Sequence, residues 1–278
     1  MKPLDLAGQR PLVWAHRGGR GLGPENTLHT LRKGYAAGAN GWETDVQLTK
    51  DGKLILLHDL GLLRLTNAGA LPHFRDNPPA VPWRFTLEEL HLLRADAFPR
   101  RACPQRNPHR PWLDVSLPES SELGIPTLEM GLDLTLELGM WINIEIKDLT
   151  RSVPRPLADT VVQKVLNAVE ERNMADQVII SSFNHDYIRE SKQLAPHVLT
   201  GALTAHRFPG DPIEATLQAG ADAWHPGHRF LTEAAVSRAR EGGLFVTPYT
   251  VNEVSDMRRL TDWGVSGIVT DFPDRAAR

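Results

Sequence analysis

The chain has 278 residues and a formal net charge of −3, which fits one α/β domain of about 250 residues with an insertion and provides no basic face for nucleic acid. No apolar run approaches the roughly 18 residues of a membrane span, and the first residues lack the apolar segment of a signal peptide. The single cysteine, Cys103, excludes an internal disulfide, which suits a reducing compartment. Together, the charge, the hydropathy and the cysteine count predict a cytoplasmic protein without nucleic-acid partners or integral membrane segments.

Short apolar runs alternate with helix-forming stretches along most of the chain. The expected strands are 11–16, 41–48, 140–147, 177–183, 198–203, 223–225, 244–250 and 267–271. The expected helices are about 26–37, 127–138, 157–172, 185–194, 212–219, 233–241 and 253–262. Repeated strand–helix units predict a parallel sheet, and eight of them predict a closed TIM (β/α)8 barrel, with an open doubly wound sheet as the alternative.

Turn residues mark the boundaries between the first elements. A glycine-rich stretch at 18–23 follows the first strand and allows an unusual backbone path. Either Asn26 or Thr27 is expected to cap the first helix. The Asp-Gly pair at 51–52 predicts a tight hairpin, after which 54–57 returns as an extended segment.

The alternation breaks down between about residues 60 and 125, and ten of the 21 prolines lie in the span 72–126. One helix is expected at 86–93, with Thr86 as its cap. The remainder predicts a long irregular insertion inside a single domain spanning 1–278. The stretch 99–111 carries four arginines and no acidic residue, so it is either a basic lip that attracts anions or a solvated loop.

Acidic side chains lie on two of the expected strands. Residues two apart on a strand point the same way, so Glu43 and Asp45 share one face. On 140–147, Glu145 and Lys147 lie opposite an apolar face. Buried carboxylates repel one another unless a cation lies between them, although an ion-paired cluster is the simpler alternative. Three carboxylate ligands predict a hard divalent ion, Mg²⁺ or Ca²⁺, with Mn²⁺ also possible.

Two histidines, His16 and His58, each end a separate apolar run and can project from one rim of the barrel. Such a pair suits general acid–base catalysis, although either histidine alone can be structural. The Arg17 guanidinium suits phosphate oxygens, and Glu25 is expected to support the site from behind. The glycine-rich stretch either presents backbone amides to an anion or simply permits a tight turn.

The chain resembles the glycerophosphodiester phosphodiesterase family over most of its length. The resemblance rests on these segments in order: HRGGRGLGPENT, ETDVQLTKDGKLILLHD, LLRLTNAG, IPTLEMGLDL, NIEIK, YTVN and GIVTDFP. It implies a TIM barrel with an inserted segment and hydrolysis of glycerophosphodiesters to sn-glycerol 3-phosphate and an alcohol. It also implies a metal on Glu43, Asp45 and Glu145, acid–base roles for His16 and His58, and phosphate contacts from Arg17 and Lys147.

Some features of the sequence fit more than one interpretation. The family often has Trp where this chain has Tyr249, and the stretch 99–111 is not part of the family pattern. Phe183, Trp224, Tyr249 and Phe272 lie near strand ends and are either barrel packing or an apolar groove. A groove would favour lysophospholipase D-like activity on lysophospholipids, and a catalytically silent phosphodiester-binding barrel is a third reading. Either histidine can act as the acid or as the base, and the nucleophile is either the 2-hydroxyl of glycerol or water.

Overall fold

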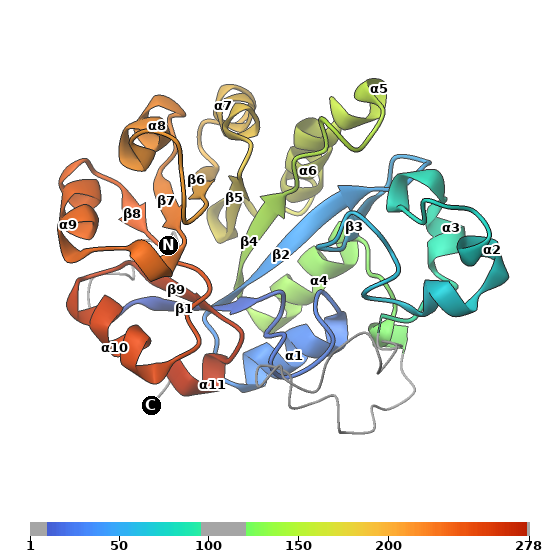
Figure 1. Cartoon of the computed structure of the whole chain (residues 1–278), viewed down its shortest axis with the longest axis horizontal. Coiled ribbons are helices and arrows are strands. Elements are labelled where there is room, and N and C mark those ends of the chain that lie inside the picture. The colour runs from blue at the N-terminus through green and yellow to red at the C-terminus, as the bar shows by residue number, and fades with distance from the viewer. Residues whose placement is uncertain (1–9, 96–120, 277–278) are drawn as a thin grey trace.

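A barrel of parallel strands forms the centre of the computed structural model, which describes residues 10–95 and 121–276 (Figure 1). The strands follow the order β8-β7-β6-β5-β4-β2-β1-β9. They are β1 (Leu12–His16), β2 (Gly41–Leu48), β4 (Trp141–Ile146), β5 (Val178–Ser182), β6 (Leu199–Thr204), β7 (Ala223–Pro226), β8 (Phe245–Val246) and β9 (Gly267–Thr270). Backbone bonds from Ser266 N to Val246 O (2.8 Å) and from Val269 N to Pro248 O (3.0 Å) join the two ends. The predicted closed barrel is confirmed, and the open sheet is wrong.

Helices surround the strands (Figure 1). They are α1 (Leu28–Ala36), α4 (Leu128–Leu138), α5 (Arg155–Ala158), α6 (Val161–Glu170), α7 (His185–Leu194), α8 (Pro212–Gln218), α9 (Glu233–Glu241), α10 (Val254–Asp262) and α11 (Pro273–Ala276), with short 3₁₀ turns η6 (Ala175–Gln177) and η7 (His228–Phe230). The helix expected at 157–172 is replaced by α5 and α6, and α11 was not expected. Thr27 rather than Asn26 caps α1, since its side chain accepts from Thr30 N.

The two faces of each strand have different roles. Trp42 on β2 points outward and donates from Nε1 to Thr135 Oγ1 of α4 at 2.8 Å, while Ile142 and Ile144 of β4 are buried in the same layer. Inside the barrel, an apolar cluster that includes Trp14 and Ile179 fills the part nearer the amino ends of the strands. Inward-facing positions nearer the carboxyl ends of the strands are polar, so this end is where a site can form.

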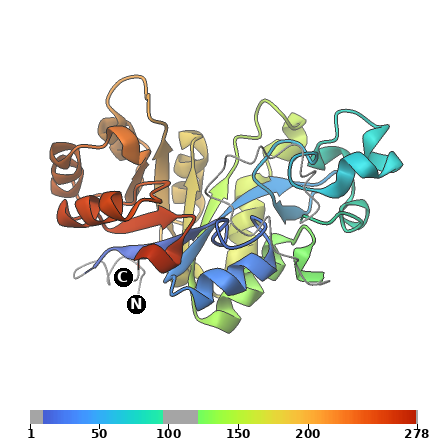
Figure 2. The same ribbon diagram turned by 60° about the horizontal axis from the view of Figure 1, so that its bottom comes forward.

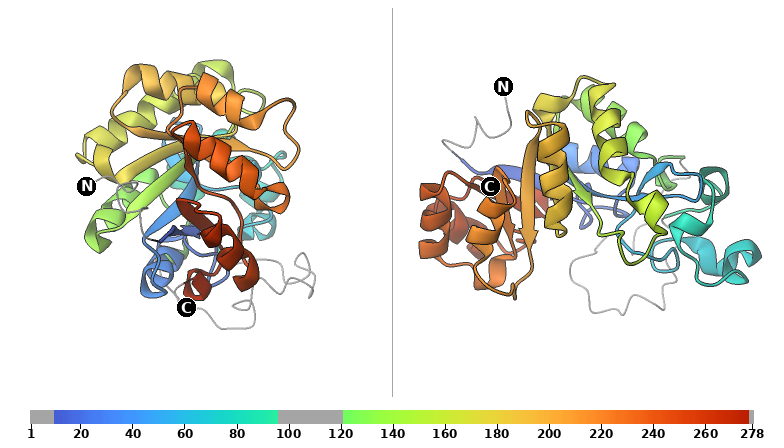
Figure 3. Two further views of the ribbon diagram at one scale, coloured as in Figure 1. Left: turned by 90° about the vertical axis from the view of Figure 1, so that its left-hand side faces the viewer. Right: turned by 90° about the horizontal axis from the view of Figure 1, so that it is seen from above.

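The segment after β2 first forms the expected hairpin. β3 (Leu54–Leu56) pairs antiparallel with β2, and Gly52 occupies the turn with φ +70°. The segment then leaves the barrel and lies to one side of it (Figure 2), as the view from above also shows (Figure 3).

The described part of the insertion is more regular than predicted. It contains η2 (Asn67–Ala70), α2 (Pro72–Arg75), η3 (Pro82–Arg84), α3 (Leu87–Leu90) and η5 (Ser121–Leu123). Thr86 caps α3 in a capping box with Glu89, so the predicted cap is confirmed. The helix is shorter than predicted, because α3 ends at Leu90 and not at residue 93. Pro72 and Pro82 begin helices rather than break them, because proline at a first helical position needs no N–H donor.

A small core holds these turns together, with Phe74, Phe85 and Leu90 buried in one cluster. The stretch 99–111 and Cys103 lie outside the described residues. Across 10–95 and 121–276, no helix has both the length and the apolar character needed to cross a bilayer. The single domain over 1–278 stays a prediction.

Candidate active site

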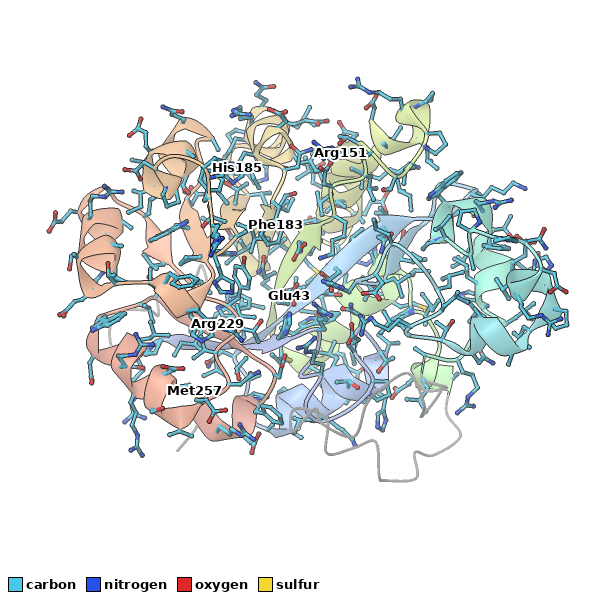
Figure 4. The ribbon with its side chains drawn as sticks, viewed as in Figure 1. Glu43, Arg151, Phe183, His185, Arg229 and Met257 are labelled. Carbon is cyan, nitrogen blue, oxygen red and sulfur yellow. The ribbon has the colours of Figure 1, made fainter. Side chains whose placement is uncertain are left out.

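Three carboxylates meet at the centre of the barrel. Asp45 of β2 pairs in register with Glu145 of β4, and Glu43 lies two residues earlier on the same face of β2. One oxygen from each side chain lies within 4.8 Å of the others, and all three residues are buried. Figure 4 shows Glu43 beside β2 and β4, with Phe183 nearby. The tertiary structure thus brings together the three residues predicted as ligands.

The charges in this cluster are not balanced evenly. Burial raises the pKa of Glu43 well above its usual range, and the charges of Asp45 and Glu145 raise it further. Burial also opposes ionisation of Asp45, but Lys147 and Arg17 hold its pKa well below the usual value. A cluster that is short of positive charge and made only of carboxylate oxygens fits a hard divalent cation.

The two predicted phosphate-binding cations contact carboxylates in this structure. Lys147 Nζ lies 2.7 Å from Asp45 Oδ1 and 2.5 Å from Glu145 Oε1. Arg17 donates from its backbone N–H to Glu43 Oε2 at 3.0 Å and from Nη1 to Glu25 Oε1 at 2.6 Å. Arg17 and Lys147 line the same cavity as Glu43 and Glu145. An anion bound in this cavity can therefore contact both basic side chains and a metal ion held by the carboxylates.

Asn26, which the sequence predicts only as a helix cap, also belongs to the site. Its Nδ2 donates to Asp45 Oδ2 at 2.8 Å, and its Oδ1 accepts from Thr44 Oγ1 at 2.8 Å. Thr44 lies between Glu43 and Asp45 on β2 and faces the other way. Asn26 therefore fixes the orientation of Asp45 from the start of α1.

His16 ends β1 and is held by a carboxylate from the far end of the chain. Its Nδ1 lies 2.5 Å from Asp271 Oδ1, and its Nε2 lies 3.9 Å from Glu43 Oε2. Burial and the charge of Arg17 lower the pKa of His16 to about 4, against the opposite effect of Asp271. A neutral ring that donates from Nδ1 to Asp271 leaves the Nε2 lone pair facing the carboxylates.

Asp271 was not among the predicted site residues. It is buried directly after β9 and also accepts hydrogen bonds from Arg20 Nε and Asn252 Nδ2, both at 2.8 Å. The sequence does contain one indication of Asp271, its position at the end of an expected strand. A carboxylate at the carboxyl end of a barrel strand is a candidate site residue. That signal does not say which histidine the carboxylate meets.

His58 follows β3 and lies nearer the solvent. Its Nδ1 is 2.8 Å from Asp59 Oδ1, and its side chain is 32% exposed. Arg64, in the insertion, donates from Nη2 to Asp59 Oδ1 at 2.6 Å and to Glu25 Oε1 at 2.9 Å, and its Nε also bonds Asp59. Because Glu25 binds Arg17, one charged chain links the neighbourhood of His58 to that of Arg17.

The glycine-rich stretch makes a tight turn rather than an anion site. The amides of Gly18 and Gly19 donate to Ala15 O and His16 O, and the amide of Gly21 donates to Asp271 O. Gly18 and Gly19 adopt φ values of +83° and +97°, which other residues rarely reach. These amides are already used, so the anion reading is not supported; the turn instead holds His16 beside Asp271.

One cavity of about 210 Å³ collects these groups. Among the predicted residues, its lining includes His16, Arg17, Glu43, His58, Glu145 and Lys147. Asp45 is buried behind them. Phe183, which is 44% exposed, and Tyr249 also line the cavity and pack edge to face, with ring centres 6.0 Å apart.

Two other aromatic residues that were candidates for an apolar groove lie elsewhere. Trp224 is buried in the cluster under α9 and α10 and donates from Nε1 to Thr204 Oγ1 at 2.9 Å. Phe272 is buried beneath Arg275, whose guanidinium carbon lies 3.8 Å from the ring centre. Neither residue lines the cavity, so a groove built from all four aromatic residues is wrong.

Comparison with known proteins identifies one family. The model of the glycerophosphoryl diester phosphodiesterase family matches residues 16–275. The chain is 34% identical to the uncharacterized protein YqiK of Bacillus subtilis and 33% identical to the glycerophosphodiester phosphodiesterase of Caldanaerobacter subterraneus, in each case over 95% of this chain and 96% of the relative.

Solved structures share the fold. A Silicibacter pomeroyi structure assigned to the same family has a TM-score of 0.83 and 28% identity, covering 99% of this chain and 96% of that one. An Oleispira antarctica phosphodiesterase, solved in complex with the product sn-glycerol-3-phosphate, has a TM-score of 0.76 and 24% identity over 96% of both chains. The chain therefore belongs to the glycerophosphodiester phosphodiesterase family and is a hydrolase of phosphoric diesters.

Proposed function

We propose that the chain hydrolyses glycerophosphodiesters to sn-glycerol 3-phosphate and an alcohol, using a divalent metal and two histidines. The observation that carries this proposal is the meeting of three buried carboxylates with two histidines whose Nδ1 atoms are each held by an aspartate. The product bound to the Oleispira antarctica relative supports the same reaction.

Glu43, Asp45 and Glu145 are the residues that would hold Mg²⁺ or Ca²⁺, with Mn²⁺ also suited to their oxygens. A divalent cation bound there acts as a Lewis acid, which stabilises charge on the phosphate and makes a nearby hydroxyl more acidic. Lys147 and Arg17 then contact the phosphate oxygens and stabilise the charge that develops in the transition state.

The two histidines divide the proton transfers by position. His16 is buried and neutral, so its Nε2 removes the proton from the attacking hydroxyl. His58 lies at the exposed side and donates a proton to the departing alkoxide. The attacking group is the 2-hydroxyl of the substrate's own glycerol, which forms a cyclic phosphate that water then opens; direct attack by water is the alternative.

A metal-supplemented screen of glycerophosphodiesters, coupled to detection of glycerol 3-phosphate, tests this function. We expect metal-dependent release from glycerophosphocholine. The exposed Phe183 beside Tyr249 favours a second candidate, hydrolysis of lysophosphatidylcholine, which the same screen includes. Faster turnover of the lysophospholipid would support that candidate, and a complete lack of turnover would support a silent binding barrel.

Arg64 of the insertion positions catalytic groups, because it bonds both Asp59, which holds His58, and Glu25, which holds Arg17. Arg64 itself does not line the cavity. Arg64→Met is expected to lower kcat about 10-fold, since small displacements of catalytic groups are costly. Metal affinity should not change. Arg75→Met is the matched control, since Arg75 pairs with Asp76 on the exposed side of the same insertion.

Added guanidinium should restore part of the activity of Arg64→Met, because the Arg64 side chain is 37% exposed and its place is open to a small cation. Arg64→Lys should retain less activity than the wild type, since an ammonium cannot bind two carboxylates in the geometry of a guanidinium. If Arg64→Met behaves like Arg75→Met, Arg64 has no positioning role.

A further inference from the structure

One wall of the cavity carries polar groups that the proposed reaction leaves unused. Asn143 of β4, Ser181 of β5 and His225 of β7 line the cavity and are almost completely buried. Asn143 Oδ1, Ser181 Oγ and both ring nitrogens of His225 have no hydrogen-bond partner among the described residues. Buried polar atoms are nearly always satisfied, so this wall is built to face a polar ligand or water.

Gly201 of β6 explains how these groups come together. Strand β6 lies between β5 and β7, and Gly201 pairs in register with Ser181. A Cβ atom on Gly201 would lie 2.5 Å from His225 Cε1 and 2.7 Å from His225 Nε2. The imidazole therefore lies over Gly201 and extends across β6 toward Ser181, in space that any side chain at position 201 would occupy.

The three side chains of this wall are neutral, unlike the charged residues of β2 and β4 that line the same cavity. Burial lowers the pKa of His225 to about 4, so the ring is uncharged at neutral pH. Ser181 and Asn143 carry no charge, whereas Glu43, Glu145 and Lys147 are charged residues that line the same cavity on the neighbouring strand positions. A hydroxyl group, which both donates and accepts a hydrogen bond, suits this wall better than a phosphate does.

We propose that Ser181 and His225, with Asn143 beside them, bind the terminal hydroxyl of the substrate's glycerol and make the enzyme selective for glycerol that is not acylated there. This inference rests on the proposed function. Ser181 pairs in register with Glu145, so the wall adjoins the metal-binding carboxylates. The departing alcohol leaves beside the more exposed His58, which places glycerol on the deeper, buried side.

This wall would distinguish glycerophosphodiesters, whose terminal hydroxyl is free, from lysophospholipids that are acylated there. An acyl ester at the terminal hydroxyl removes its proton, so the wall loses a hydrogen-bond donor and its buried acceptors stay unpaired. Sites built to bind a hydroxyl reject analogues that lack it, and the three side chains of this wall are almost completely buried. Lysophospholipids acylated at that position are therefore expected to be poor substrates.

A comparison of two serines tests the proposal. Ser181→Ala removes the unpartnered hydroxyl in the cavity. Ser182→Ala is the matched control, because Ser182 is equally buried but donates to Ile146 O at 2.7 Å. Each variant is assayed for kcat/KM on glycerophosphocholine and on its analogue without the terminal hydroxyl. A second assay measures binding of glycerol 3-phosphate and of propane-1,2-diol 1-phosphate, which needs no turnover.

We expect Ser181→Ala to lose about 3- to 10-fold on glycerophosphocholine and less than about twofold on the analogue, the size of one neutral hydrogen bond. The binding assay should show the same split, and Ser182→Ala should treat both compounds alike. Equal losses on both compounds would overturn the proposal and leave a hydrated wall only. If the loss in Ser181→Ala differs between glycerophosphocholine and glycerophosphoethanolamine, the proposal is wrong and the wall contacts the head group instead.

The two proposals fail in different ways. If wild-type protein turns over glycerophosphocholine and the analogue equally well, the phosphodiesterase function stands and the glycerol subsite is wrong. If it turns over no glycerophosphodiester with any of the three metals, the proposed function is wrong. In that case, equal affinity for glycerol 3-phosphate and its deoxy analogue would overturn the subsite as well.

Discussion

Replacing His16 by alanine is expected to lower kcat about 10²-fold or more, because the variant has no group that can take the proton from the attacking hydroxyl. His58→Ala should lose at least as much as a typical general acid contributes, again about 10²-fold. The rate of the wild type should be bell-shaped against pH, and each variant should lack one limb. Steady-state kinetics across pH with glycerophosphocholine measures both effects.

Asp271→Asn is the informative companion to His16→Ala. Asparagine has nearly the same size as aspartate, but it removes the charge that orients the Nδ1–H of His16 and stabilises the protonated ring. We expect a loss of about 10²-fold in kcat with little change in metal affinity. His73→Ala serves as the control, since His73 bonds Glu89 on the exposed side of the insertion. Near-full activity in both His16→Ala and His58→Ala would show that the acid–base assignment is wrong.

Removing the metal should abolish turnover, because without a divalent cation the buried carboxylates repel an anionic substrate. EDTA is expected to reduce the rate to background, and Mg²⁺, Ca²⁺ or Mn²⁺ should restore it. Glu145→Gln should weaken metal binding at least about 10-fold, since the neutral amide replaces one of three charged ligands. Calorimetric titration of the protein with each metal measures this affinity directly.

The control for Glu145→Gln is Glu137→Gln, which removes an exposed carboxylate that pairs with Arg32 on the surface. That variant should bind metal as the wild type does. Unchanged affinity in Glu145→Gln would remove Glu145 from the ligand set. Activity that persists after exhaustive chelation would refute the metal-dependent mechanism while leaving the family membership intact.

Local periodicity was enough to predict most of the carboxylate cluster. The alternation of side chains along a strand places Glu43 and Asp45 on one face and Glu145 and Lys147 on another. Those relations extend over two residues, so they hold in any strand that the segments can form. The repeated strand–helix units then predicted the barrel, which puts β2 and β4 next to each other.

The insertion shows where local signals were ambiguous. Its prolines read as breaks, yet Pro72 and Pro82 begin short helices that bury Phe74 and Phe85. A proline signals either outcome, and burial of neighbouring side chains decides between them. Similarly, both Asn26 and Thr27 suited a helix cap, and the position of Asp45 decided that Asn26 binds the carboxylate instead.

By itself, the sequence determined the order of the strands, the polar face of each and the residue types that a phosphodiester site needs. Only the tertiary structure decided that Asp271 meets His16 across 255 residues, that Arg64 links Asp59 to Glu25, and that His225 lies over Gly201. Closing the barrel brings the first strand beside the last and sets how far each strand is displaced along its neighbour. No periodicity within a single strand encodes those distances.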